Sequence, residues 1–285
     1  MTFKKIRFVT DSTSDIPADL VANHRIGIVP CFINHGDQSF ADDGRELVRE
    51  DFYNQLPSMR PAPTTAAPSP GMAKEVIEAA IADADHVVIV SVASKLSGTY
   101  NAMRLGAAHL PPERVTLIDS ESVTLGLGWQ VLIGAEVAEE TGDIEQTIAA
   151  IRRVRQHANV YAALETMEFL RRSGRVGWAA ASIGALLQIK PLLHVYEGDV
   201  KAVSRVRTFS RAFDELVRLG SEQAPLDRLA ILHAANPEGA QDLLERMKDV
   251  APADVIIVSI TPTIGTHIGP GGLGLATVSQ LWRTT

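Results

Sequence analysis

The first half of the chain alternates short apolar runs with longer segments of helical periodicity. The clearest run, Val87 to Val90, is continuously apolar and β-branched, as expected of a strand covered on both faces of a parallel sheet. The predicted strands of this half cover residues 6–10, 26–33, 87–90 and 115–119. The predicted helices begin at Pro17 and near Ser97, and cover residues 49–56, 72–82, 122–139 and 144–157. This alternation predicts an α/β fold with a mostly parallel sheet.

Beyond about residue 150 the pattern loosens. Two strand-like segments on either side of Glu197-Gly198-Asp199 predict a β-hairpin. The predicted strands here cover residues 161–164, 189–196, 200–207, 229–234, 255–260 and 275–278. The predicted helices cover residues 165–172, 179–187, 209–223 and 237–250. We therefore expect an N-terminal α/β domain at residues 1–150 and an α+β C-terminal domain at residues 151–285.

The strand at residues 87–90 leads into a turn of small residues. Ser91, Ser94, Ser97, Gly98 and Thr99 follow at the carboxyl end of the strand, where open α/β sheets bind ligands. Hydroxyl groups together with the free N–H groups of a helix start suit a small anion such as a carboxylate. The alternative is that Ser97 only caps the helix.

A proline-rich stretch covers residues 57–70 and contains five prolines, which exclude a helix and disfavour a central strand. It encloses the residues Thr64-Thr65-Ala66-Ala67. A stiffened backbone lowers the entropy lost when a side chain is held still, which suits a loop that presents a hydroxyl group to a ligand. A surface linker is the alternative.

The segment 261–274 is rich in glycine and contains G-x-G-x-x-G at residues 269–274. It does not fit a dinucleotide fingerprint, because no helix and no acidic residue follow it. The glycines are expected to let the backbone pass close to a ligand or to another strand. His267, which lies between Thr263 and the glycines, is either a polar ligand contact or a structural histidine.

Composition narrows the function classes. The chain has 285 residues and a net charge of -7, which argues against nucleic acid as a partner. One cysteine, Cys31, excludes an internal disulfide and is expected to be a buried, inert thiol. Asp42-Asp43 is expected to be a solvated loop rather than a metal site. Without a signal peptide or an apolar stretch of membrane-spanning length, we expect a cytoplasmic protein.

The sequence contains no P-loop, H-E-x-x-H, C-x-x-C or G-x-S-x-G motif. A hydrolase that uses Ser97 and His267 stays open, although no specific orienting acid is evident. Arginines cluster in the second half, either as a solvated face or as a docking surface for an acidic or phosphate-bearing partner. They are Arg171, Arg172, Arg175, Arg205, Arg207 and Arg211.

Five ordered motifs together resemble the DegV family, whose members are bacterial fatty-acid-binding proteins and include the acyl-binding subunit of fatty acid kinase. The motifs are VTDSTSDI at 9–16, PTTAAPSP at 63–70, SKLSGTY at 94–100, EFLRRSGR at 168–175 and THIGPG at 266–271. The resemblance covers nearly the whole chain. It implies two α/β domains with one fatty acid buried between them.

The resemblance also implies residue roles. The carboxylate would be bound by Thr65, by Ser97 with Gly98, and by His267, with the fatty acid as ligand and no further cofactor. Arg175 would contact a partner or phosphate, and we assign Arg205 to the same task. Ala66-Ala67 departs from the usual Ser-Gln and removes one hydroxyl and one amide from the loop.

We therefore expect a non-catalytic protein that binds a long-chain fatty acid and presents its carboxylate to a partner kinase for ATP-dependent acyl phosphate formation. The alternatives are a lipid carrier or regulator without a kinase, and a serine esterase that uses Ser97. We expect neutral donors around the carboxylate. The residues expected to line the acyl tunnel are Ile183, Leu186, Leu187, Leu193 and Ile264.

Overall fold

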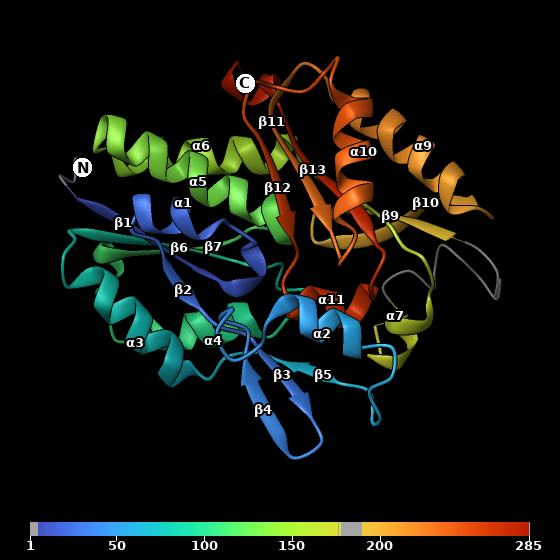
Figure 1. Cartoon of the computed structure of the whole chain (residues 1–285). Helices are drawn as coiled ribbons and strands as arrows, with labels where there is room; N and C mark the ends of the chain where they lie inside the picture. Colours follow the sequence, from blue (N-terminus) through green and yellow to red (C-terminus); the bar gives the residue numbers. More distant parts are fainter. Residues whose placement is uncertain (1–4, 176, 178–189, 285) are drawn as a thin grey trace.

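The computed structural model describes residues 5–175, 177 and 190–284, and it contains three sheets. The first sheet has four parallel strands in the order β2-β1-β6-β7 (Figure 1). Its strands are β1 (Ile6–Asp11), β2 (Gly27–Val29), β6 (His86–Ser91) and β7 (Val115–Asp119). The expected parallel sheet in the N-terminal half is confirmed.

Residues of alternating parity face opposite sides of this sheet. Val9, Val87 and Ile89 pack against helices α3 (Pro70–Ile81) and α4 (Thr99–Gly106). Phe8, Val88 and Val90 belong to the core that includes helix α5 (Thr124–Thr141) on the other side. Because both faces are covered, the β6 strand has no polar alternation.

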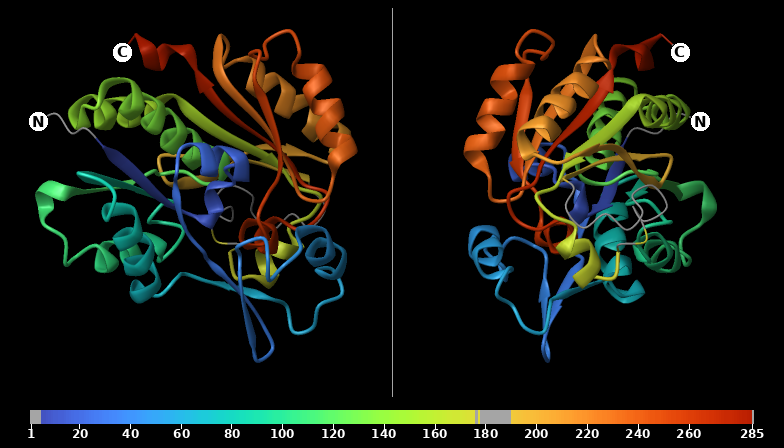
Figure 2. Two further views of the ribbon diagram at one scale, coloured as in Figure 1. Left: turned by 60° about the vertical axis from the view of Figure 1, so that its left-hand side comes forward. Right: turned by 90° about the vertical axis from the view of Figure 1, so that its right-hand side faces the viewer.

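The predicted strand at residues 26–33 is wrong as a single element. Pro30 interrupts it, and the chain continues into a second, antiparallel sheet in the order β4-β3-β5. Its strands are β3 (Phe32–His35), β4 (Gln38–Ala41) and β5 (Thr64–Ala66). The β3–β4 hairpin projects from the body of the molecule (Figure 2).

The third sheet has six strands in the order β10-β9-β8-β13-β11-β12, of which only the β11–β12 pair is parallel. Its strands are β8 (Ala158–Ala163), β9 (Lys190–Tyr196), β10 (Asp199–Val206), β11 (Leu226–His233), β12 (Val255–Ser259) and β13 (Leu273–Ser279). Positive φ angles at Glu197 and Gly198 make the tight β9–β10 turn, so the predicted hairpin is confirmed.

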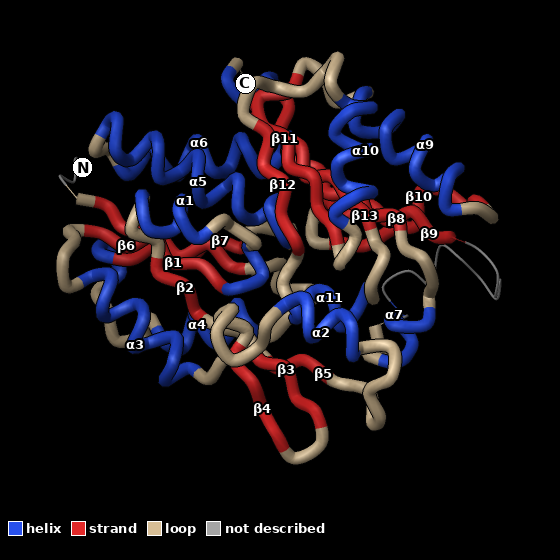
Figure 3. Tube along the Cα trace, viewed as in Figure 1, coloured by secondary structure: helices blue, strands red, loops and turns tan. Residues whose placement is uncertain are grey.

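Helices α9 (Phe209–Ser221) and α10 (Pro237–Met247) pack on one face of the six-stranded sheet. Helix α5, followed by α6 (Ile144–His157), lies between the other face and the parallel sheet (Figure 3). The indole N–H of Trp129 on α5 donates to the carbonyl oxygen of Ala276 at 3.2 Å. Contact with both sheets explains why α5 is buried on all sides over residues 124–135.

Three further helices are short. They are α1 (Ala18–Asn23), α2 (Arg49–Gln55) and α7 (Glu168–Arg172). The helix predicted at residues 179–187 lies outside the described residues. Among the described residues, none of the helices combines the length and the hydrophobicity that spanning a bilayer requires.

Candidate functional site

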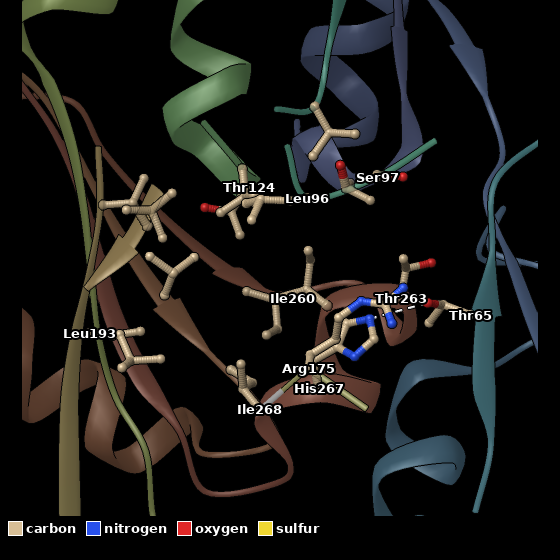
Figure 4. Close-up of a pocket in the computed structure, with 18 of the residues that line it drawn as sticks. Thr65, Leu96, Ser97, Thr124, Arg175, Leu193, Ile260, Thr263, His267 and Ile268 are labelled. Carbon is tan, nitrogen blue, oxygen red and sulfur yellow. Dashed lines mark hydrogen bonds between the residues drawn. The ribbon is translucent and has the colours of Figure 1, made fainter. Parts of the chain in front are cut away.

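A cavity of about 610 Å³ lies between the parallel sheet and the six-stranded sheet (Figure 4). Most of its wall is aliphatic and comes from both halves of the chain. These residues include Val92, Leu96, Val123, Val160, Leu193, Val195, Leu232, Ile260, Ile264 and Ile268. Of the residues expected to line a tunnel, Leu193 and Ile264 do so, whereas Ile183, Leu186 and Leu187 lie outside the described residues.

Polar side chains gather at one end of this cavity. Thr65 is positioned by strand β5, where it lies opposite Ile33 of β3. His267 lies in helix α11 (Pro262–Ile268), and its Nε2 is 3.1 Å from the Thr65 hydroxyl oxygen (Figure 4). The structure therefore brings together two predicted site residues that are about 200 positions apart in the sequence.

Helix α11 was not predicted, because its segment was interpreted only as rich in glycine. Pro262 in the first turn and Gly269 after the last turn, with φ 75°, delimit the helix. Gly265 permits a close approach, because a Cβ atom there would lie 2.2 Å from the Tyr53 hydroxyl oxygen. These features are readable in the sequence once the segment is known to pack against another element.

His267 is neutral in the folded protein near pH 7. Burial, and secondarily the positive charge of Arg175, lowers the pKa of His267 to about 3. A neutral imidazole next to the Thr65 hydroxyl group can donate or accept a hydrogen bond according to its tautomer.

Ser97 and Gly98 line the same cavity from the turn after β6. Helix α4 begins at Thr99, two residues later than the predicted start. The Ser97 hydroxyl oxygen accepts the Thr99 N–H at 3.2 Å and lies 2.8 Å from the Thr99 hydroxyl oxygen. A Cβ atom at Gly98 would lie 3.7 Å from the Cβ atom of Ala67, so the turn is adjacent to the proline-rich loop.

Arg175 reaches the cavity wall because helix α7 ends in a Schellman motif. The N–H of Gly174 donates to the carbonyl oxygen of Arg171 at 3.1 Å, and that of Arg175 donates to Leu170 at 2.8 Å. Gly174 has φ 73°, which reverses the chain at this point. The S-G-R part of the motif thus places a cation in the wall of the cavity that also contains His267.

The predicted role of Arg205 stays a prediction. The residue belongs to strand β10, where its backbone lies opposite Pro191 in β9.

Several cavity residues were not predicted. Thr13, Lys95, Thr124 and Thr263 all line the wall. Lys95 lies within the SKLSGTY motif, but its partners are distant in sequence: its ammonium group donates to the Glu197 carbonyl oxygen at 3.1 Å. Only the tertiary fold brings such groups together.

Cys31 also lines the cavity, and its predicted burial is confirmed. Its sulfur lies 3.7 Å from the Thr99 hydroxyl oxygen. Burial raises the pKa of this thiol, which keeps it protonated.

The prediction of a solvated loop at Asp42-Asp43 is wrong for Asp42. Asp42 is buried and accepts the Thr263 N–H at 3.0 Å, whereas Asp43 is exposed. No cluster of metal-ligating side chains occurs within the described part of the chain.

Comparison with known proteins decides the family. The family profile described as "Uncharacterised protein, DegV family" matches residues 5–280. The chain belongs to the DegV family. A DegV domain-containing protein of Streptomyces coelicolor is 32% identical, with 97% of this chain and 99% of that protein aligned. A DegV domain-containing protein of Deinococcus radiodurans is 34% identical, with 95% and 97% aligned.

Two solved DegV structures have the same fold. One is a DegV family protein from Thermus thermophilus whose structure is reported for its fatty acid binding. It is 31% identical, with a TM-score of 0.89 over 96% of this chain and 99% of its own. DegV from Bacillus subtilis, described as a fatty acid binding protein, is 27% identical, with a TM-score of 0.86 over 97% and 99%. Both relatives are thus fatty-acid-binding proteins.

Proposed function

We propose that this DegV protein binds a long-chain fatty acid in the cavity between the two expected domains, residues 1–150 and 151–285. The proposal rests on one cavity that has Thr65 and His267 at one end and a mostly aliphatic wall. A volume of about 610 Å³ falls within the usual range of ligand pockets. The fatty-acid-binding relatives support the same ligand class.

The two ends of the ligand have different energetic tasks. Burial of a methylene group contributes ~0.8 kcal/mol, so about a dozen contribute ~10 kcal/mol before association costs are subtracted. Removing a carboxylate from water costs several kcal/mol unless hydrogen bonds replace the lost water. The acyl chain therefore supplies affinity, while the polar end sets orientation and selects an acid.

The carboxylate would lie beside Thr65, Ser97, Gly98 and His267. The Thr65 and Ser97 hydroxyl groups can each donate one hydrogen bond to it, and a neutral imidazole protonated at Nε2 can donate to the Thr65 oxygen and so orient that hydroxyl. Arg175 adds a positive charge to the same cavity, beyond the neutral donors expected from the sequence. This charge favours the ionised acid over its neutral derivatives.

We further propose that the bound carboxylate is presented to a partner kinase. A carboxylate oxygen would attack the γ-phosphorus of ATP, forming the acyl phosphate as the bond to the ADP oxygen breaks. Arg175 and Arg205 would contact the transferred phosphate or the partner. The absence of a P-loop in the sequence is compatible with a nucleotide held by the other protein.

The esterase alternative is less favoured by the hydrogen bonding. Ser97 pairs with Thr99, and His267 pairs with Thr65. A serine nucleophile needs a histidine base within hydrogen-bond reach, and the described residues pair these two side chains with other partners. A covalent acyl-serine in intact mass spectrometry would reinstate the esterase.

Native mass spectrometry of the purified protein tests the ligand class directly. We expect an adduct with the mass of a fatty acid that is removed by delipidation and restored by palmitate. Failure of the delipidated protein to bind any long-chain acid would refute the proposal.

The kinase step is tested by mixing the protein, palmitate, Mg-ATP and the candidate kinase. We expect acyl phosphate to form only when all four are present. Palmitate binding without phosphate transfer would instead favour a lipid carrier or regulator.

A further inference from the structure

The acidic motif at residues 11–15 belongs to the sequence signature, but of its five residues only Thr13 lines the cavity. Both of its aspartates, Asp11 and Asp15, are buried at the carboxyl end of β1. A buried carboxylate is costly unless hydrogen bonds compensate it. The partners of these carboxylates therefore indicate what the motif does.

Asp11 holds the segment that leads to Ser97. Its carboxylate accepts the N–H of Val92 at 2.8 Å and that of Thr13 at 3.1 Å. Val92 follows strand β6 and begins the turn that contains Ser97. The neighbouring Ser12 hydroxyl oxygen accepts the Cys31 N–H at 3.0 Å.

Asp15 and Asp42 hold the beginning of helix α11. Asp15 accepts the Thr261 N–H at 2.7 Å, and Asp42 accepts the Thr263 N–H at 3.0 Å. Both amides are at the start of the helix, where backbone N–H groups have no partner within the helix. Two buried acids from the N-terminal half thus replace the missing hydrogen bonds.

The residues just before α11 also form hydrogen bonds with the N-terminal half of the chain. The guanidinium group of Arg49 on α2 donates to the carbonyl oxygen of Ser259, and the Tyr53 hydroxyl donates to that of Ile260 at 3.1 Å. Helix α11 has only seven residues, too few to be stable without tertiary contacts. Its position, and hence that of His267, depends on these bonds.

We infer that Asp15 and Asp42 are positioning residues for His267. They connect the start of α11 to the N-terminal half, and α11 in turn places the imidazole beside the Thr65 hydroxyl. The expected loss of ligand affinity rests on the proposed fatty-acid function, whereas the expected change in the position of His267 does not.

The test compares Asp42→Ala with Asp42→Asn, because asparagine retains an oxygen that can accept the Thr263 N–H. The control is Asp43→Ala, which removes an adjacent exposed carboxylate whose bonds are to the N–H groups of Arg45 and Glu46. Ring NMR signals of His267 are followed against pH in ligand-free protein, and palmitate affinity is measured by calorimetry.

We expect Asp42→Ala to raise the pKa of His267 measurably and to weaken palmitate binding at least tenfold. Asp42→Asn and Asp43→Ala should each stay within threefold of the wild-type affinity and leave the His267 titration unchanged. A folded Asp42→Ala protein with wild-type His267 titration and affinity would overturn the inference. If the wild type binds no palmitate, the proposed function fails while the NMR comparison still tests the positioning.

A measurement on the wild type covers the case in which Asp42→Ala does not fold. Hydrogen exchange of the Thr261 and Thr263 amides is compared with and without saturating palmitate. Because the ligand should bind only when α11 is in place, we expect exchange to slow at least tenfold. Unchanged exchange at both amides, with palmitate bound, would contradict the inference.

Discussion

At the scale of single residues, the proposed carboxylate site contains one side-chain pair that spans the chain. Thr65 and His267 belong to elements that are far apart in the sequence, and the Thr65 hydroxyl oxygen lies 3.1 Å from Nε2 of His267. Burial lowers the pKa of His267 to about 3, whereas Thr65 is half-buried. A carboxylate placed here would exchange water for fixed donors.

Thr65→Val tests the hydroxyl group at nearly constant shape. Loss of a hydrogen bond to a charged group costs ~1.5–3 kcal/mol, so palmitate affinity should fall ~10–150-fold in calorimetry. The matched control is Thr64→Val, an exposed neighbour on the same strand, which should bind like the wild type. Equal affinities for the two variants would exclude Thr65 from the carboxylate site.

The titration of His267 predicts a pH-dependent stability difference. Its pKa is about 3 in the folded protein and 6.5 as the ordinary value, so unfolding takes up a proton below pH 6.5. The wild type should therefore lose stability relative to His267→Gln as the pH falls from 6.5 towards 3, by up to ~1.4 kcal/mol per pH unit. Urea unfolding at pH 7 and pH 5 measures the difference, and a pH-independent difference would contradict the assignment.

The pH dependence of stability expected from Asp15 has the opposite sign to that expected from His267. Burial, opposed by Arg49, raises the pKa of Asp15 from 3.8 to about 7, so the folded protein binds the extra proton. The wild type should lose stability relative to Asp15→Asn as the pH rises from 3.8 to 7. The same urea experiment checks this, and a wild type that gains stability relative to Asp15→Asn over that range would refute the raised pKa.

At the scale of elements, helix α11 contributes His267 to the site and is also the element that the sequence did not predict. Its glycines and proline favour a loop by composition, and the hydrogen bonds that stabilise its start come from Asp15 and Asp42. Tertiary contacts thus decide the conformation of a segment whose local propensity is weak. By contrast, α6 was predicted at residues 144–157 because its periodicity is strong, and in the structure Asp143 caps the helix.

Gly265→Ala tests the close packing of α11 on α2. A Cβ atom would overlap the Tyr53 ring, so we expect a loss of ~1–3 kcal/mol in unfolding free energy and a parallel loss of palmitate affinity. Gly71→Ala on α3 is the control, because its Cβ atom would meet no atom closer than 3.8 Å. Thermal unfolding should show a lower Tm for Gly265→Ala only; the same Tm in both variants would show that α11 is not tightly packed there.

At the scale of the whole molecule, the parallel sheet and the six-stranded sheet are joined by α5, and the cavity opens between them. Hydrophobic patterning predicted most strands and helices, since burial on one or both faces leaves a readable period. Patterning alone could not predict that residues 26–33 divide between two sheets at Pro30. Nor could it predict which polar residues meet: the motifs indicated Thr65, Ser97 and His267, but the buried acids emerged only from the fold.

Arg175→Ala tests the division between binding and transfer. With the cation removed, the pKa of His267 should rise, and palmitate affinity should fall no more than severalfold because the acyl chain supplies most of the affinity. Acyl phosphate formation with the partner kinase should fall more than tenfold. Equal losses of binding and transfer would assign Arg175 to the carboxylate site alone.

If Thr65 and His267 bind an ionised head group, the cavity should distinguish a fatty acid from its ester. Calorimetry of the delipidated protein with palmitate and with methyl palmitate measures this preference, since the two ligands share an acyl chain. We expect the acid to bind at least tenfold more tightly than the ester, and Thr65→Val to reduce this preference. Equal binding of acid and ester by the wild type would show that the head group is not selected there.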